Sequence, residues 1–128
     1  MREIRFRAWY KQDNQMCPVA GTYHNLVCIE RKEEGAKSVL VRDVDAFELM
    51  QYTGLKDCKG QEIYEGDIVR INHPQDSTGD FTNAIGSVFW WDEEGGWYHG
   101  NENGRPPKRM WKYVEVIGNI YEHPEPIR

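Results

Sequence analysis

Short runs of alternating hydrophobic and polar positions follow one another along this chain. Residues 3–10 have a period of two that places Ile4, Phe6 and Ala8 on one side, and this period predicts a half-buried strand. Further runs rich in β-branched and aromatic residues, which favour strands, cover residues 26–29, 39–41, 62–64, 68–71, 87–91, 97–99 and 114–121. No segment sustains a period of 3.6, so we expect no long helix.

Turn signals separate these runs and are densest within residues 49–71. Asp57 accepts backbone hydrogen bonds readily and Gly60 tolerates a positive φ, which predicts a turn over residues 56–61. A second tight turn is expected at residues 65–67, and the two glycines of residues 92–96 predict a hairpin. This spacing of turns predicts a meander of antiparallel strands.

Other connections are predicted from charge and from proline and glycine. We expect an exposed turn over the charged residues 30–35, and a single helical turn near residue 44 that is capped by Asp43 or Asp45. Gly118 indicates a bulge in the last strand. The remaining predictions are long loops over residues 73–86 and 100–108, a short strand or turn over 110–113, and a loose tail that begins at 123.

Short strands separated by turns predict an all-β fold. The order of turns and strands after residue 60 is typical of a small SH3-like barrel, an analogy that concerns fold alone. We expect a single domain in which residues 49–122 form the barrel core, residues 1–48 add N-terminal strands packed onto it, and residues 123–128 form the tail.

Composition narrows the function classes. The 128 residues are 39% hydrophobic and carry a net charge of −5, which suits a folded domain and argues against a general nucleic-acid binder. No apolar run is long enough to span a membrane, and charges occupy the N-terminal positions where a signal peptide needs an apolar segment. The three cysteines show no C-x-x-C spacing, so we expect a reducing cytoplasm.

Catalytic and metal-binding patterns are lacking in the sequence. The four histidines and three cysteines are scattered, so we predict neither a metal nor another cofactor. Glu62, Glu65 and Asp67 lie around one turn, where an acid/base pair is the alternative to ordinary turn and solvent roles. Because no phosphate-binding loop or nucleophile motif occurs either, we predict no catalytic residue and no enzyme.

Aromatic residues between 90 and 113 form the first candidate surface. Trp90 and Trp91 are adjacent in a predicted strand and must point to opposite faces, so that only one of them can fill the same core. The other is covered by loops or meets a partner, a second copy or a small ligand. The candidate interaction residues in this region are Trp90, Trp91, Trp97, Tyr98, Trp111 and Tyr113.

A basic segment lies among the last of these aromatic residues. Charge interleaved with aromatic rings is a pattern that can grip single-stranded nucleic acid, and the alternative is local neutralisation of acidic residues 92–94 and Glu102. The overall negative charge favours neutralisation. The basic residues of the segment are Arg105, Lys108, Arg109 and Lys112.

Three motifs resemble those of the YopX family of phage and prophage proteins. They are residues 1–9 (MREIRFRAW), the run 49–70, and residues 115–122 (EVIGNIYE). Tyr10 stands where the family usually has an acidic residue, and Cys58 stands in a turn that usually reads Asp-Lys-Asn-Gly. The resemblance implies a β-rich protein of a bacterial cytoplasm and carries no established activity and no site residue.

Taken together, these patterns predict a phage- or prophage-encoded accessory protein that binds a protein partner or itself, and a homo-oligomer is expected. The alternative is a nucleic-acid-binding module that uses residues 105–113. We expect the protein to act in the cytoplasm of a bacterial host, without a membrane association.

Overall fold

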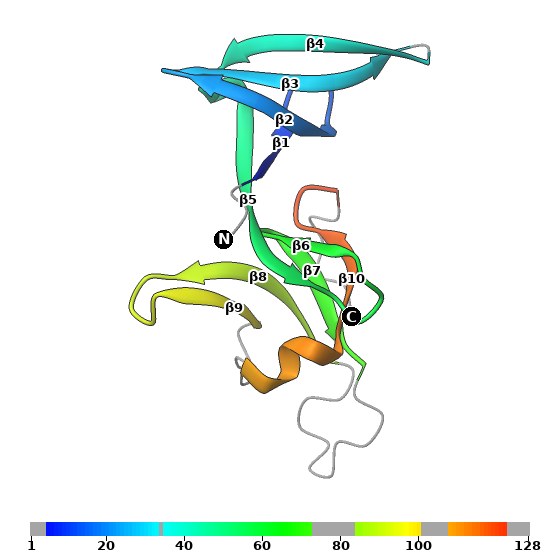
Figure 1. Ribbon diagram of the computed structural model, residues 1–128, viewed down its shortest axis with the longest axis vertical. Coiled ribbons are helices and arrows are strands. Elements are labelled where there is room, and N and C mark those ends of the chain that lie inside the picture. Colours follow the sequence, from blue (N-terminus) through cyan, green and yellow to red (C-terminus); the bar gives the residue numbers. More distant parts are fainter. Residues whose placement is uncertain (1–4, 34, 73–83, 101–107, 123–128) are drawn as a thin grey trace. The chain divides into compact units, whose positions relative to one another are not determined.

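The computed structural model of the chain describes residues 5–33, 35–72, 84–100 and 108–122. Strands dominate these residues, and the two helical elements among them are 3₁₀ helices, η1 (Val44–Ala46) and η2 (Lys108–Tyr113). The predicted all-β class is therefore confirmed. The chain divides into two compact units, Met1–Tyr52 and Thr53–Arg128, which are described separately (Figure 1).

Unit 1 contains four complete strands and the first half of a fifth. The strands are β1 (Phe6–Tyr10), β2 (Gln15–Tyr23), β3 (Leu26–Glu33), β4 (Ala36–Asp43) and β5 (Phe47–Lys56), which runs on into unit 2. All pairings are antiparallel and follow the order β4-β3-β2-β1-β5, with the short strand β6 (Glu62–Tyr64) next to β5 (Figure 1). The alternation predicted for residues 3–10 thus produces the strand that pairs with β5, an element distant in sequence.

The inner face of this sheet holds the core of unit 1. Ala8 and Tyr10 from β1 pack with Val27 and Ile29 from β3, and Phe47 closes the group with its ring 5.2 Å from that of Tyr10. Cys17 belongs to the same buried cluster. Each strand contributes alternate residues, as a sheet with one buried face requires.

Two predictions on unit 1 have opposite outcomes. Asp43 does cap a single turn, since its carboxylate accepts a hydrogen bond from the backbone N–H of Asp45 at 3.0 Å. The exposed turn predicted over residues 30–35 is wrong, because β3 continues to Glu33 and pairs with β4 throughout. Charged side chains do not interrupt a strand whose backbone is paired, so the reversal shrinks to the residues around Gly35, which has φ 81°.

Unit 2 is built on a second antiparallel sheet. Its strands are β7 (Asp67–Ile71), β8 (Ile85–Trp91), β9 (Gly96–Gly100) and β10 (Val114–Asn119), arranged in the order β10-β7-β8-β9. Ile63 from β6, Val69, Val88 and Val114 form its core with Trp97. The register of β10 on β7 shifts between Val116 and Gly118, which is the bulge that Gly118 predicts.

The turns predicted within 49–71 occur where expected. Gly60 and Gly66 have φ values of 86° and 84°, and β6 and β7 follow them directly. Residues 108–113 form η2 rather than the predicted strand or turn, because this coil brings both Trp111 and Tyr113 onto the core of unit 2. No closed barrel is formed by the strands of the described residues, so the finer expectation of an SH3-like barrel stays a prediction.

Candidate functional site

The β8–β9 hairpin sorts the predicted aromatic residues onto two faces. Trp90 lies opposite Trp97 in the register, and their rings meet edge to face at 5.2 Å. Trp97 is buried in the core, whereas Trp90 is 42% exposed at the end of the same face. Trp90 is therefore held by one aromatic neighbour and presents the rest of its indole to solvent.

The opposite face of the hairpin carries a second aromatic group. Trp91 meets Tyr98 edge to face at 4.8 Å, and the ring of Phe89 lies 6.5 Å from that of Tyr98. All three side chains are half-buried. Mutual packing of this kind covers aromatic surface without a second layer of structure, which answers the sequence question of what covers Trp91.

His99 is a functional candidate that the sequence does not single out. It is 2% exposed, and its ring lies 4.4 Å from that of Trp111, edge to face. Burial lowers the pKa of His99 from 6.5 to about 4, and its Nε2 has no hydrogen-bond partner. A histidine that stays neutral and packs against an aromatic ring serves the core of unit 2.

The basic segment is only partly within the described residues. Arg105 lies outside them, and so do the side chains of Lys108 and Arg109, whose backbone forms the start of η2. Lys112 is exposed, with its ammonium 5.1 Å from the centre of the Tyr113 ring. Of the two aromatic residues in the segment, Trp111 packs its ring against that of His99.

Asp57 accepts three backbone hydrogen bonds with its carboxylate, and its role is structural. One oxygen accepts hydrogen bonds from the backbone N–H groups of Lys59 and Gln61, both at 2.8 Å, and the other accepts from Val116 at 3.0 Å. The Cys58 N–H also donates to the carbonyl of Val114. The predicted turn is therefore tied to β10 as well as closed on itself.

A second carboxylate, that of Glu115 on β10, lies beside two positively charged side chains. Glu115 accepts from Lys59 at 2.9 Å, from Asn72 at 2.9 Å and from Arg70 at 3.2 Å. Lys59 and Asn72 lower the pKa of Glu115 to about 2, with Arg70 adding to the effect. A carboxylate held ionised in this way is a poor general acid or base near neutral pH.

The acid/base alternative around Glu62, Glu65 and Asp67 gains no support from the geometry. The Asp67 carboxylate is buried and accepts the backbone N–H of Tyr64 at 2.8 Å, across the tight turn. This is the turn role that the sequence also allows. Among the described residues, no group of three or more potential ligands could hold a metal ion.

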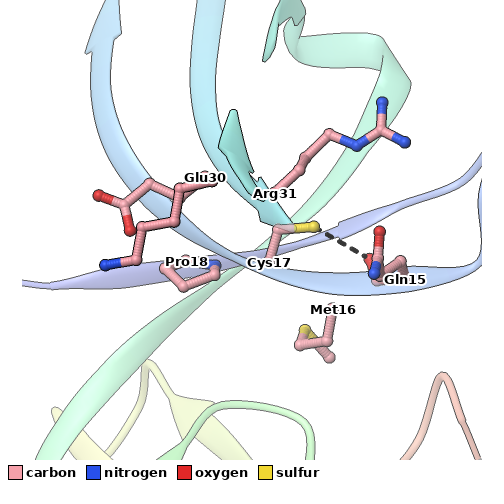
Figure 2. A pocket seen from close by; sticks show the side chains of 7 residues that line it. Gln15, Met16, Cys17, Pro18, Glu30 and Arg31 are labelled. Atoms are coloured by element: carbon pink, nitrogen blue, oxygen red, sulfur yellow. Dashed lines mark hydrogen bonds between the residues drawn. The ribbon is translucent and has the colours of Figure 1, made fainter. Parts of the chain in front are cut away.

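A small cavity lies on the β2–β3 sheet of unit 1. Its volume is about 210 Å³, and it is lined by Gln15, Met16, Cys17, Pro18, Glu30, Arg31 and Lys37 (Figure 2). That volume is below the roughly 300–1,000 Å³ of most ligand pockets.

The Cys17 sulfur in this cavity is directed at the carbonyl of Gln15, 3.8 Å away (Figure 2). Burial raises the pKa of the Cys17 thiol, which disfavours a nucleophilic thiolate. Arg31 is engaged by Asp13 at 2.6 Å. The cavity is therefore smaller than most ligand pockets, and its thiol is disfavoured as a nucleophile.

The largest exposed feature of unit 1 was not anticipated from the sequence. The register places Tyr23 opposite Leu26 and Cys28 opposite Val41, so these side chains share the side of the sheet that faces away from the core. We call this surface the outer apolar face; its members are Tyr23 (71% exposed), Leu26 (43%), Val39 (63%), Val41 (47%) and the half-buried Cys28.

A signal for this face was present in the sequence. Val39 and Val41 are two residues apart, as are Leu26 and Cys28, so each pair must share a face of its strand. The local pattern does not indicate whether Val39 or Leu40 points to the core. The sequence alone therefore does not show which face of this strand is exposed. Contiguous exposed apolar side chains of this kind mark interaction surfaces.

The fold is that of a small protein with two antiparallel sheets and an exposed apolar face. A family model described as YopX protein matches residues 5–128, and the chain therefore belongs to the YopX family. This confirms the resemblance carried by the three sequence motifs.

A solved protein structure shares the fold of this chain. The chain is similar to protein EF1440 from Enterococcus faecalis, whose crystal structure matches with a TM-score of 0.68 and 22% identity over 98% of each chain. That likeness shows the fold alone. No curated protein matches the chain. Among the helices of the described residues, none has the length and apolar character that crossing a membrane requires.

Proposed function

We propose that this YopX-family member is a phage- or prophage-encoded accessory protein that acts in the bacterial cytoplasm by binding a protein, either itself or a host component, and not by catalysis. The observation that carries the proposal is the outer apolar face. Four large apolar side chains there are each more than two-fifths exposed, on the three paired strands β2, β3 and β4. Such a surface is stabilised when a partner removes it from water.

The chemistry of the described side chains supports a binding role. The carboxylates of Asp57 and Asp67 are engaged by backbone N–H groups, and Glu115 is surrounded by cationic and amide donors. Burial raises the pKa of the Cys17 thiol and lowers that of His99. Each of these groups is used to hold the fold, which leaves the apolar surface as the best-supported functional element.

The test compares association before and after the outer apolar face is made polar. We expect Tyr23→Ser with Val39→Ser to abolish both self-association, followed by light scattering, and retention of host proteins from a bacterial extract. Ile120→Ser is the matched control, since Ile120 is 41% exposed but belongs to unit 2. Association that is equally strong in the double variant and the control would contradict the proposal.

The alternative of nucleic-acid binding through residues 105–113 has less support. The acidic net charge of −5 opposes it, and the Trp111 ring already packs on His99. It predicts that single-stranded DNA or RNA binds more weakly as salt rises, and that Lys108→Glu with Arg109→Glu removes the binding. Binding that is unchanged in this double variant would exclude the segment.

A further inference from the structure

We propose that the open edge of β4 pairs with β4 of a second copy, in an antiparallel register that sets Lys37 opposite Asp43 and Val39 opposite Val41. The pairing rests on the proposed function, because it names the partner as the protein itself and the contact as a strand edge beside the outer apolar face. It would join two unit 1 sheets into one continuous sheet.

The edge of β4 that faces away from β3 is open along its length. β4 is eight residues long and stands first in the strand order, with β3 on one side and no strand of the described residues on the other (Figure 1). Seven of its residues are exposed, and Leu40 is half-buried. Long, regular edges of this kind are templates for a further strand, and proteins that must avoid pairing shorten, twist or interrupt them.

The backbone N–H and C=O groups of alternate β4 residues point toward the open edge. Val44 N–H donates to the carbonyl of Asn25 at 2.7 Å, one step beyond the pair Leu26–Asp43. Because hydrogen-bonded and non-hydrogen-bonded pairs alternate in an antiparallel ladder, the groups of Ser38, Leu40 and Arg42 face β3. Those of residues 37, 39, 41 and 43 face the open side.

One hydrogen bond agrees with this assignment. The carbonyl of Val41 accepts from the guanidinium of Arg42, its own neighbour, at 2.8 Å. A carbonyl bonded to β3 would not need this partner, whereas one on the open edge is available to it. A carbonyl oxygen has two lone pairs, so Arg42 does not prevent an incoming N–H from binding there as well.

The sequence of β4 is complementary to that of a second β4 running antiparallel to it. An antiparallel pair of identical edges must place outward-facing residues opposite one another, and the two-fold axis through Leu40 does so. It also sets the ammonium of Lys37 against the carboxylate of Asp43 at both ends, with valines between them. Sliding the strands by one allowed step sets Lys37 against Val41, or Val39 against Asp43, and leaves a charge beside a valine.

This match favours a second copy over an unrelated peptide. In the matched register Val39 and Val41 of both copies lie side by side on the outer apolar face, together with Cys28 from β3. Both the hydrogen-bond direction and the charge order are satisfied by the same eight residues read in reverse. A foreign strand has no reason to carry that order.

A charge exchange tests the register with the full-length chain. We expect sedimentation equilibrium to show a wild-type dimer, and Lys37→Glu or Asp43→Lys alone to weaken it about tenfold or more, because each sets like charges together. Mixing the two variants restores attraction at both ends and should return dimerisation to near the wild-type strength. Lys56→Glu, at an exposed lysine on β5, should leave the dimer unchanged. Recovery on mixing also shows that loss of the Asp43 cap has not unfolded either variant.

A pair of proline variants tests the backbone assignment. Val39→Pro removes an N–H that faces the open side, so unit 1 should stay folded by circular dichroism while the dimer is lost. Ser38→Pro removes a donor to β3 and should unfold the β3–β4 hairpin instead. A dimer that survives Val39→Pro, or a mixture that fails to recover, overturns the pairing.

The two proposals fail differently. If the protein is a monomer that still retains a host partner through Tyr23 and Val39, β4 pairing is wrong and the proposed function stands. The same holds if it dimerises but is indifferent to the substitutions at Lys37 and Val39. If it associates with neither itself nor a host protein, both proposals are wrong.

Discussion

The two units of this chain solve the problem of a small core in different ways. Among the described residues, each buried polar or charged side chain belongs to unit 2; they are Thr53, Asp57, Asp67, His99 and Asn119. Unit 1 has none of these and instead leaves four of its apolar side chains exposed on one face. Unit 2 combines an apolar core with buried polar contacts, whereas unit 1 is held by strand pairing and an apolar core.

Strand length accounts for the difference. In unit 1, β3 and β4 pair over eight consecutive positions, so the ladder itself fixes the register and needs few side-chain ties. In the four-stranded sheet of unit 2, each described pairing covers five residue pairs or fewer, and short ladders satisfy fewer backbone groups. Side chains such as Asp57 then complete the hydrogen bonding.

The largest expected effect is at the centre of the polar contacts in unit 2. Asp57→Ala leaves the N–H groups of Lys59, Gln61 and Val116 without their acceptor. Because an unpaired donor away from water costs roughly 1–3 kcal/mol and all three donors are part-buried, we expect a loss of about 4 kcal/mol in the free energy of unfolding. Urea unfolding followed by tryptophan fluorescence measures it, since four of the five tryptophans lie after residue 53.

Asp57→Asn is the matched control, because it keeps one oxygen for the turn and loses the acceptor of Val116. It should fall between the wild type and the alanine variant. If alanine costs no more than asparagine, the tie to β10 does not stabilise unit 2, and the contrast between the units is wrong.

Acid should weaken unit 2 through His99. Burial keeps the pKa of His99 at about 4, whereas the unfolded chain has about 6.5, so the unfolded state binds more protons between these values. The stabilisation is complete above pH 6.5 and is lost as the pH falls toward 4, by up to about 3 kcal/mol. Unfolding free energies at a series of pH values measure this loss, and the pH dependence in His99→Phe should be smaller by that amount. Identical curves for the wild type and His99→Phe would show that the buried histidine does not contribute.

Gly86→Ala tests how closely the strands of unit 2 approach one another. A Cβ at this position would lie 2.5 Å from the backbone of Gly100, and backbone cannot move aside as a flexible side chain does. We expect about 2 kcal/mol of destabilisation by overpacking, measured by the same urea titration.

Gly21→Ala, in unit 1, is the corresponding control because nothing lies within 4 Å of the added methyl group. Its effect should stay within about 0.5 kcal/mol. Equal costs at the two positions would mean that the close approach to Gly100 relaxes freely.

Lys59→Ala should have the smallest effect. Lys59 contacts Glu115 at 2.9 Å, but its side chain is 69% exposed, and Arg70 and Asn72 remain on the same carboxylate. We expect no measurable change in the free energy of unfolding, as for most exposed ion pairs. A larger loss, measured by thermal or urea unfolding, would show that ion pairs on the surface of unit 2 also stabilise it.

Local chemistry was the part of the fold that the sequence predicts well. The turn at Asp57, the positive φ of Gly60 and Gly66, the cap at Asp43 and the bulge near Gly118 each depend on residues close in the chain. Strand ends were harder, because β3 runs through charged residues up to Glu33 whose side chains carry no signal of backbone pairing.

The candidate surfaces depended on contacts between distant residues and were predicted less well. The opposite faces of Trp90 and Trp91 follow from alternation, but their coverage by Trp97 and Tyr98 depends on the partner strand. The outer apolar face requires knowing which side of β3 and β4 meets the core. Neither can be read from one strand alone.

The bond between Asp57 and Val116 has a consequence for synthesis on the ribosome. The two residues are 59 positions apart, so this bond cannot form until Val116 has been synthesised. The β3–β4 hairpin needs only neighbouring residues and forms much earlier. We therefore expect the β4 edge to be complete before the sheet of unit 2 can close.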